Sequence, residues 1–297
     1  MLKGIAVGFL SYGLFSSTDA CVKALGALGM PIFEMLFLIT LITFVGTIGF
    51  AKPRGEKWRE VFHLHRPGLV LLRASCGVFA GLLGVYAFTT LPLAEAYSLL
   101  FLMPAFATIL SIPLLGEEVG WRRWLAVGIG FCGVLLVVRP GFRDLHLGHL
   151  AAAAAAVFAA LSLITLRVLG PTEKRVSVLA VVYLAALLFN FPLMLLNYRT
   201  PSTREMWILL LAGLVGGVGQ ITMMIATRLA PANRIAPAQY SQIIWAVVFG
   251  ATFFGELPDG VAFAGMALVI ASGLFTFFRE EQLHQWSRRV LLLRSRP

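Results

Sequence analysis

Long apolar runs limit most strongly what this chain can fold into. Segments of about 20 residues with few charges recur along the sequence, and a helix of about that length spans the hydrocarbon core of a bilayer. Backbone polar groups inside a bilayer must pair with one another, so only helix bundles and closed barrels cross it. Barrel strands are shorter and alternate in polarity. The runs therefore predict an all-α membrane protein.

Composition supports this interpretation. Charged residues make up 13% of the chain and hydrophobic residues 59%, whereas soluble domains carry about 25% charged residues. Too few charges remain to cover a surface that faces water on all sides. Much of the apolar area is therefore expected to face lipid.

Proline, glycine and charged residues divide the chain into ten predicted spans. We expect them at residues 3–26, 32–51, 68–90, 95–115, 122–139, 147–169, 176–197, 206–229, 235–255 and 260–279. With the N-terminus in the cytoplasm, the inner loops and the tail hold 19 of the 24 Lys and Arg residues, as the positive-inside rule requires. The even number of spans then predicts that both termini are cytoplasmic, in a multi-pass protein of the cytoplasmic (inner) membrane.

The net charge of +10 raises the question of a nucleic-acid partner. The basic residues are spread over several short loops, where Lys and Arg interact with anionic lipid headgroups. We therefore expect membrane lipid, and not nucleic acid, beside these charges.

No sequence pattern predicts catalysis, a metal site or a cofactor. Cys21, Cys76 and Cys132 lie in apolar runs without the spacing of metal ligands. The histidines form no ligand set, and the chain has no HExxH, GxSxG or Walker motif. We expect neither an enzyme nor an ATP-driven pump.

An internal repeat relates the two halves of the chain. Residues 86–117 align with 225–256 at an offset of 139 residues. The matches are Ala87 with Ala226, Pro92 with Pro231, Ala107 with Ala246, and Gly116-Glu117 with Gly255-Glu256. Each half, 3–139 and 147–279, holds five predicted spans, and a basic cytoplasmic tail follows at 280–297. An odd number of spans inverts the second half in the membrane, as in many secondary transporters.

These features together resemble the EamA family of the drug/metabolite transporter superfamily. The resemblance rests on the ten-span layout, the Pro turns before the fourth and ninth spans, Leu-Leu-Gly-Glu at 114–117, Phe-Phe-Gly-Glu at 253–256 and the Gly-rich fifth and tenth spans. It covers about residues 3–279 and implies a ten-helix inverted repeat that exports small metabolites. Among members of the family, the chain is most similar to the amino-acid exporters, the aromatic amino-acid group especially.

Polar and aromatic residues inside spans are candidates for a substrate cavity. In the span 235–255, Ser241, Gln242 and Trp245 share one helix face, and the repeat-equivalent face of 95–115 is apolar, with Met103 and Phe106. Two such walls suit an amphipathic solute, although ordinary helix packing explains the same residues. The predicted cavity set is Tyr12, Phe15, Met103, Phe106, Ser162, Gln220, Met224, Ser241, Gln242 and Trp245.

Carboxylates and tyrosines near the outer ends of spans are candidates for coupling or gating. They are Asp19, Glu34, Glu95, Tyr86 and Tyr97. Asp19 and Lys23 are four residues apart, so a local ion pair competes with a proton-coupling or substrate-amine site. An interfacial position equally explains the two tyrosines. No carboxylate lies clearly at mid-span, so proton coupling and gradient-driven export both stay open.

The sequence thus favours a secondary transporter that exports amino acids or related small amphipathic metabolites by alternating access. The alternatives are an exporter of drugs, nucleosides or other metabolites, and a lipid flippase. The expected partners are a small-molecule substrate and membrane lipid. One copy contains both halves, so a monomer suffices and a dimer stays open.

Overall fold

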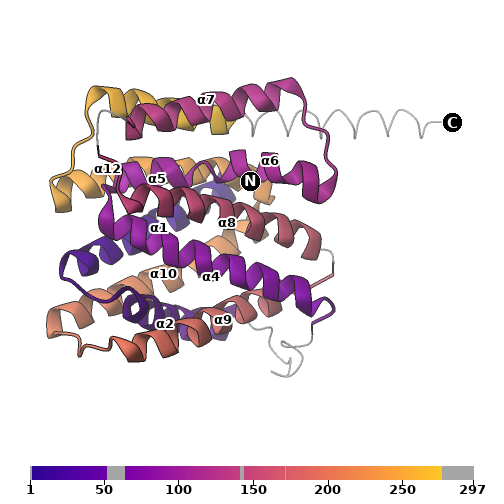
Figure 1. The fold of residues 1–297 in the computed structure, drawn as a ribbon. Coiled ribbons are helices and arrows are strands. Elements are labelled where there is room, and N and C mark those ends of the chain that lie inside the picture. Colours follow the sequence, from indigo (N-terminus) through magenta and orange to yellow (C-terminus); the bar gives the residue numbers. More distant parts are fainter. Residues whose placement is uncertain (1, 52–63, 141–143, 171, 276–297) are drawn as a thin grey trace.

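The computed structural model describes residues 2–51, 64–140, 144–170 and 172–275. Long helices lie side by side in this part of the chain (Figure 1). They are α1 (Leu2–Ala27), α2 (Ile32–Ala51), α4 (Pro67–Thr90), α5 (Leu93–Leu100), α6 (Met103–Leu115), α7 (Trp121–Val138), α8 (Leu147–Leu169), α9 (Arg175–Leu196), α10 (Thr203–Leu229), α11 (Ala232–Ile235), the 3₁₀ helix η1 (Ala236–Tyr240), α12 (Ser241–Phe254) and a last helix at Gly260–Phe275.

Eight spans in the described residues are long and apolar enough to cross a membrane, with α5 and α6 counted together as Leu93–Leu115. The other two predicted spans coincide with shorter helices: 235–255 with η1 and α12, and 260–279 with Gly260–Phe275. The count of ten and the cytoplasmic placement of the termini stay predictions. The tail 280–297 and most of the 52–67 loop lie outside the described residues.

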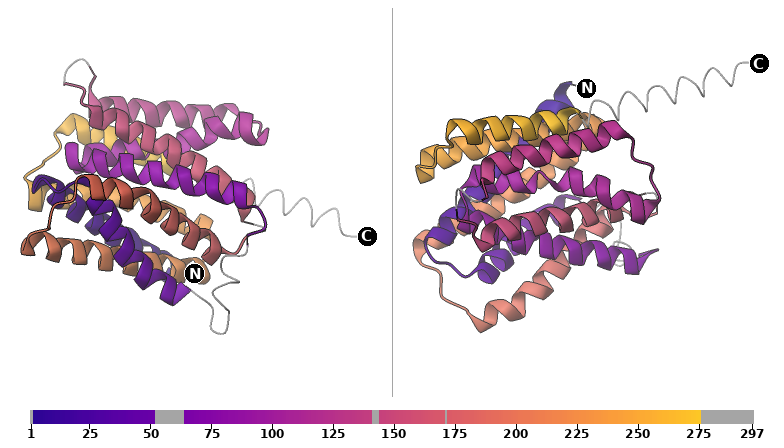
Figure 2. Two further views of the ribbon diagram at one scale, coloured as in Figure 1. Left: turned by 60° about the horizontal axis from the view of Figure 1, so that its bottom comes forward. Right: turned by 45° about the horizontal axis from the view of Figure 1, so that its top comes forward.

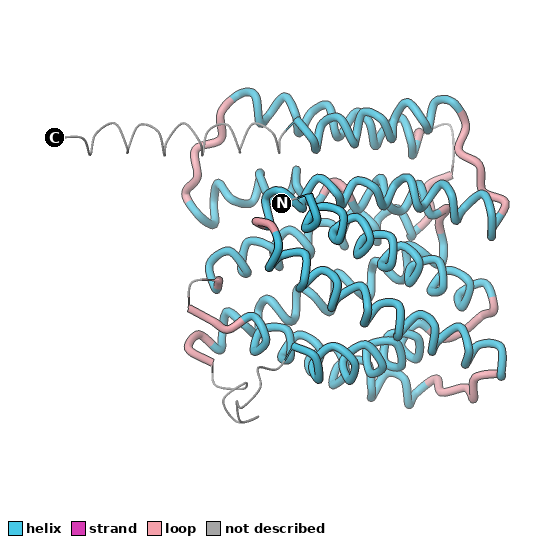
Figure 3. The backbone as a smooth tube through the Cα atoms, turned by 180° about the vertical axis from the view of Figure 1, so that it is seen from behind, coloured by secondary structure: helices cyan, strands magenta, loops and turns pink. Residues whose placement is uncertain are grey.

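The helices form layers. In Figure 1, α7 and the helix Gly260–Phe275 lie at the top, α5, α6, α8 and α12 beneath them, and α2 and α9 at the bottom. The views of Figure 2 show the same separation of α7 and the last helix from α9 and α10. Most connections gather at two opposite ends of the bundle (Figure 3), as expected for helices that cross one layer of lipid.

Helices from the two halves pack against each other in an exchanged pattern. α1 packs along α10, and its repeat counterpart α8 packs along α4, the counterpart of α10. α2 likewise meets its own counterpart α9, and α5 meets α12. The main buried cluster draws residues from both halves, including Tyr97, Val137, Ile243 and Met266. The two halves therefore build one shared core.

Two helices end identically at repeat-equivalent residues. The Leu91 N–H donates to the Ala87 carbonyl at the end of α4, over 2.9 Å, and the Ala230 N–H donates to Ala226 at the end of α10, also over 2.9 Å. A proline follows each of these ends and prevents the helix from continuing. The two helix ends thus share the same backbone geometry.

The Gly-Glu pairs also play the same part in both halves. Gly116 after α6 and Gly255 after α12 each have φ of 67°, a left-handed conformation that glycine adopts without steric cost. The next residue's N–H donates back to the carbonyl of Ser111 or Gly250, respectively. This geometry satisfies the last carbonyls of each helix and explains why the pair recurs.

The predicted spans 95–115 and 235–255 are not single continuous helices, contrary to expectation. α5 ends at Leu100 and α6 begins at Met103, while η1 precedes α12 in the second half. Pro104 and Pro237 lie in the first turns of α6 and η1, where the missing N–H and the ring oppose a continuous helix. The α5–α6 and η1–α12 junctions fall at nearly the same position of the repeat, whereas Pro237 lies six residues before the equivalent of Pro104.

Candidate functional site

A buried polar cluster joins α1, α5 and α12 beside these helix breaks. The Tyr97 hydroxyl donates to the Asp19 carboxylate and lies 3.2 Å from Ser16 Oγ. Gln242 Nε2 donates to the Tyr97 oxygen over 3.3 Å. Ser16, Tyr97 and Gln242 are buried. Because Gln242 belongs to the second half and the others to the first, the cluster lies where the halves meet.

Aromatic rings continue from this cluster toward the second half. Tyr97 packs between Phe88 and Phe101, with ring centroids 5.1 and 6.1 Å away. Phe101 stacks on Tyr240, with centroids 5.1 Å apart. A Cβ on Gly273 would lie 1.7 Å from the Tyr240 hydroxyl oxygen, so only glycine leaves room for this ring. Flat apolar faces thus adjoin a carboxylate, a hydroxyl and an amide.

Part of the predicted cavity set meets this region. Ser241 and Gln242 are buried, whereas Trp245 is 38% exposed; their role in a cavity stays a prediction. A Cβ on Gly13 would lie 3.2 Å from Trp245 Nε1, so the indole packs directly on the backbone of α1. Trp245 also stacks on Phe249, with centroids 5.6 Å apart.

Other predicted residues pack nearby without joining the polar cluster. Tyr12 meets Phe15 edge to face at 6.2 Å, and Phe15 packs against Gly219. Met103 and Phe106 pack against the main buried cluster, and Gln220 and Met224 are partly buried.

Ser162 belongs to a separate contact. Arg73 Nη1 of α4 donates to the Ser162 carbonyl over 2.7 Å and to its hydroxyl over 2.8 Å. The structure thus turns the Arg73 side chain toward α8. Its Nε is buried and has no hydrogen-bond partner among the described residues. This arginine therefore ties the first half to the second within the bundle.

Three ion pairs of the described residues join the halves at the end that the charge pattern assigns to the outside. They are Lys23–Glu256 at 2.7 Å, Glu95–His149 at 2.9 Å and Arg139–Asp259. Each takes one residue from each half, so together they link the halves at this end. Beside them lies a cavity of about 280 Å³, lined by Glu95, Val137, Ala246, Glu256, Asp259 and Met266 among others.

Lys23 does not form the expected local pair with Asp19. Its ammonium lies against Glu256 and donates to the Leu91 carbonyl, while Asp19 accepts from Tyr97. The spacing of four residues on α1 allowed the local pair, but tertiary partners outcompete it.

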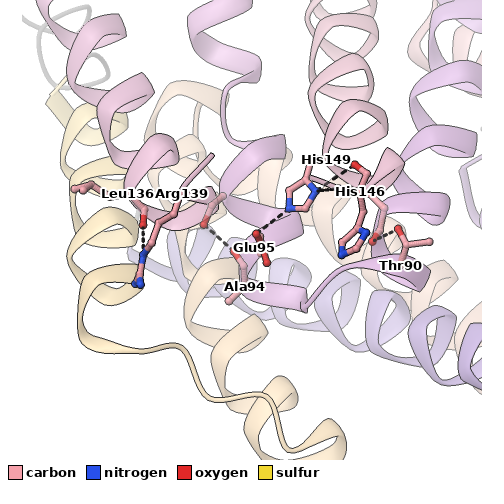
Figure 4. A network of polar contacts seen from close by, with 9 residues as sticks. Thr90, Ala94, Glu95, Leu136, Arg139, His146 and His149 are labelled. Carbon is pink, nitrogen blue, oxygen red and sulfur yellow. Dashed lines mark hydrogen bonds and ion pairs between the residues drawn. The ribbon is translucent and has the colours of Figure 1, made fainter. Parts of the chain in front are cut away.

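His149 is a site residue that the sequence did not indicate. Figure 4 shows the imidazole of His149 on α8 directed at the carboxylate of Glu95 on α5. Its other ring nitrogen lies 3.0 Å from the backbone nitrogen of His146, which fixes the ring. Both Glu95 and His149 are less than a tenth exposed. No local sequence motif predicts this pair, because Glu95 and His149 lie 54 residues apart in the chain.

The remaining gating candidates differ in burial. Glu34 is fully buried and accepts the Arg199 backbone N–H. Tyr86 stays partly exposed, whereas Tyr97 lies inside the bundle and not at an interface. Within the described residues, no group of three or more His, Cys, Asp or Glu side chains is placed to hold a metal ion.

Comparison with known proteins adds the family. A family model described as the EamA-like transporter family matches residues 2–139 and 146–278. A solved crystal structure matches with a TM-score of 0.67 and 20% identity, over 95% of this chain and 99% of that chain. At this identity, the likeness shows the fold alone.

Three curated relatives are similar along most of the chain. The S-adenosylmethionine uptake transporter of Rickettsia prowazekii is 25% identical, over 95% of this chain and 94% of the relative. The riboflavin transporter of Vibrio cholerae is 27% identical, over 90% and 84%. The pseudopaline exporter CntI of Pseudomonas aeruginosa is 26% identical, over 91% and 94%. These relatives do not support the narrower similarity to amino-acid exporters.

Proposed function

Because the chain belongs to the EamA-like transporter family, we propose that it carries a small amphipathic metabolite by alternating access between its two halves. Family membership and the relatives make it a multi-pass membrane transporter of small metabolites, in bacteria in the inner membrane. The mechanism, the direction and the substrate class form the proposal.

The cluster of Asp19, Tyr97 and Gln242 beside the facing helix breaks carries the proposal. Polar groups inside a membrane are costly and mark solute pathways. Transporters bind solutes where discontinuous helices of two repeats meet. Here, a carboxylate, a hydroxyl and an amide lie at such a junction, next to the stacked rings of Phe101 and Tyr240.

The donors and acceptors favour an amino acid or an amino-acid derivative. Asp19 offers an acceptor for an ammonium group, and the Gln242 amide offers a donor to a carboxylate. The adjoining rings suit an apolar or aromatic side chain. The relatives are named for three different solutes, so the shared fold leaves substrate selection to residues of this kind.

The exchanged packing supports the mechanism. Two inverted five-helix repeats, 3–139 and 147–279 in a ten-span protein with cytoplasmic termini, would have two nearly equivalent packings, each open to one side. The three outer ion pairs between the halves indicate that the outer side is closed here. Export then requires the inner side to open and load the substrate from the cytoplasm.

Flux in proteoliposomes tests the proposal. Purified protein is screened with labelled neutral amino acids, S-adenosylmethionine and riboflavin, with and without a pH gradient. We expect counterflow of an amine-bearing solute that Asp19→Asn abolishes, while Asp144→Asn, a change at an exposed residue, leaves it intact. Flux of riboflavin alone would overturn the substrate class. Absence of flux for every solute with folded protein would overturn the transport proposal for this set.

A further inference from the structure

Glu34 and Glu173 are buried carboxylates that lie 139 residues apart, the interval of the repeat. Glu34 lies in the first turn of α2, and Glu173 lies just before α9, the counterpart of α2. Glu34 is 0% exposed and Glu173 7% exposed. Burial of a carboxylate is unfavourable unless it is hydrogen-bonded, so both positions need a structural or functional reason.

Both carboxylates accept backbone N–H groups from the opposite half. Glu173 Oε1 accepts from His65 over 2.7 Å and from Arg66 over 2.6 Å, directly before α4. Glu34 Oε2 accepts from Arg199 over 3.4 Å, in the connection that leads into α10. Since α4 and α10 are also repeat counterparts, the two contacts are related in the same way as the halves.

The surroundings of each carboxylate differ in charge. Near Glu34, Arg199 also pairs with Glu205, which caps the start of α10 together with Ser202. Near Glu173, the His65 ring nitrogen Nδ1 lies 3.6 Å from Oε2. Each carboxylate has one buried oxygen without a hydrogen-bond partner among the described residues, Oε1 in Glu34 and Oε2 in Glu173. Glu34 accepts one backbone N–H at 3.4 Å, however, whereas Glu173 accepts two at 2.7 and 2.6 Å. Glu34 is therefore held more loosely than Glu173.

The two contacts lie at opposite ends of the bundle. In Figure 1, the α9–α10 connection lies at the left end, and the α8–α9 connection and the start of α4 lie at the right end. The positive-inside pattern assigns the first to the outside and the second to the cytoplasm. Each contact thus joins the halves at one face only.

We infer that Glu34 and Glu173 are paired latches of the transport cycle. Glu34 holds the outer face closed through the chain before α10, and Glu173 holds the inner face closed through the chain before α4. Both are engaged in this structure, so opening either face requires the release of one latch while the other stays closed. The inference rests on the proposed alternating access.

Opposite shifts by equivalent substitutions form the test. Spin labels at exposed Ala27 and Thr200 report the outer face, and labels at exposed Gly68 and Thr172 report the inner face. The labels are placed in a background without Cys21, Cys76 and Cys132, and double electron–electron resonance in nanodiscs measures the distances. We expect Glu34→Gln to populate longer outer distances and Glu173→Gln longer inner distances. The ratio of the long-distance to the short-distance population should rise roughly tenfold in each variant, as expected for the loss of one charge-assisted hydrogen bond.

Two further variants keep the test decisive. Glu117→Gln alters a carboxylate that pairs with Arg123 of its own half, and we expect it to shift neither face. Glu34→Asp and Glu173→Asp keep the negative charge on a side chain that is shorter by one methylene group. We expect smaller shifts in the same directions, and these variants keep the inference testable if the Gln variants do not fold. Equal shifts at both faces, or none, would overturn the latches.

The labelled wild type separates this inference from the proposed function. The same distances are measured with each labelled solute and at two pH values. If the outer and inner distances of the wild type change in opposite senses while the variants resemble it, alternating access stands and the latches are wrong. If the outer and inner distances stay the same in the wild type and in every variant under all of these conditions, both proposals fail.

Discussion

Phe101 and Tyr240 stack with ring centroids 5.1 Å apart, although 139 residues separate them in the chain. Each lies at the helix break of its own half. Two equivalent residues of a two-fold repeat can touch only beside the axis that relates the halves. In the proposed inverted repeat, the axis therefore passes between these rings, directly next to Tyr97 and its polar partners.

Removal of the Tyr97 hydroxyl should impair both stability and transport. Tyr97→Phe leaves Asp19 and Gln242 without their shared partner, and each unsatisfied buried group costs about 1–3 kcal/mol. We expect a lower unfolding temperature and loss of solute counterflow. Tyr198→Phe, at a tyrosine that is 56% exposed, is the matched control. Unchanged flux in Tyr97→Phe would remove this hydroxyl from the site.

The Lys23–Glu256 pair should show strong coupling. Lys23 is 9% exposed, so Lys23→Met leaves Glu256 without its cation and should cost about 1–3 kcal/mol, less than for a fully buried pair because Glu256 is partly exposed. The double variant Lys23→Met with Glu256→Gln should recover much of this loss. A double-mutant cycle on unfolding in detergent measures the coupling. Additive effects would show that the pair contributes nothing.

The contact between α7 and the last helix should depend on two glycines. A Cβ on Gly133 would lie 2.7 Å from the Gly265 carbonyl oxygen. A Cβ on Gly128 would have no neighbouring atom within 4 Å among the described residues. Gly133→Ala therefore forces the helices apart, and overpacking costs about 1–3 kcal/mol. Gly128→Ala, in the same helix, should be neutral or stabilising. Equal melting temperatures for the two variants would contradict the close packing.

The inner latch should contribute stability that acid removes. Burial favours the neutral form of Glu173, but the N–H groups of Arg66 and His65 outweigh it and hold the pKa of Glu173 below its usual range. A carboxylate with a lowered folded pKa stabilises above its unfolded pKa, about 4.3. It loses that contribution as pH falls through the folded value.

Melting temperatures measured between neutral pH and pH 3 check this behaviour. We expect Glu173→Gln to be less stable than the wild type at neutral pH, and the difference to shrink below about pH 4. Glu117→Gln serves as the control. A difference that stays constant with pH would show that the charge of Glu173 does not stabilise the fold.

Local chemistry in the sequence predicted the helix ends well. The Pro turns and the Gly-Glu pairs act on the backbone next to them, so Gly116 and Gly255 form the same cap in both halves. The spans followed from apolar length alone. The breaks before α6 and α12 were missed because hydropathy does not register a single proline, such as Pro104, inside an apolar run.

The site was harder to predict, because its contacts join distant segments. Gln242 was selected for its polarity at depth, and it lies buried beside Tyr97, while its role in a cavity stays a prediction. Lys23 was paired with the nearest carboxylate in sequence, whereas its flexible stem reaches Glu256. His149 gave no signal, since its partner Glu95 lies on another helix. Such pairs depend on which helices pack against each other, and the periodicity of a single helix does not predict its packing partners.

The exchanged packing also bears on synthesis of the chain at the ribosome. α1 enters the membrane first, yet its main partner α10 ends at Leu229. α1 must therefore wait in the bilayer for its main partner, with only its smaller contact with α4 available earlier, until about three quarters of the chain has been inserted. Assembly of this protein is consequently a late, concerted event, and a chain that stops after its first half has no partner to complete its core.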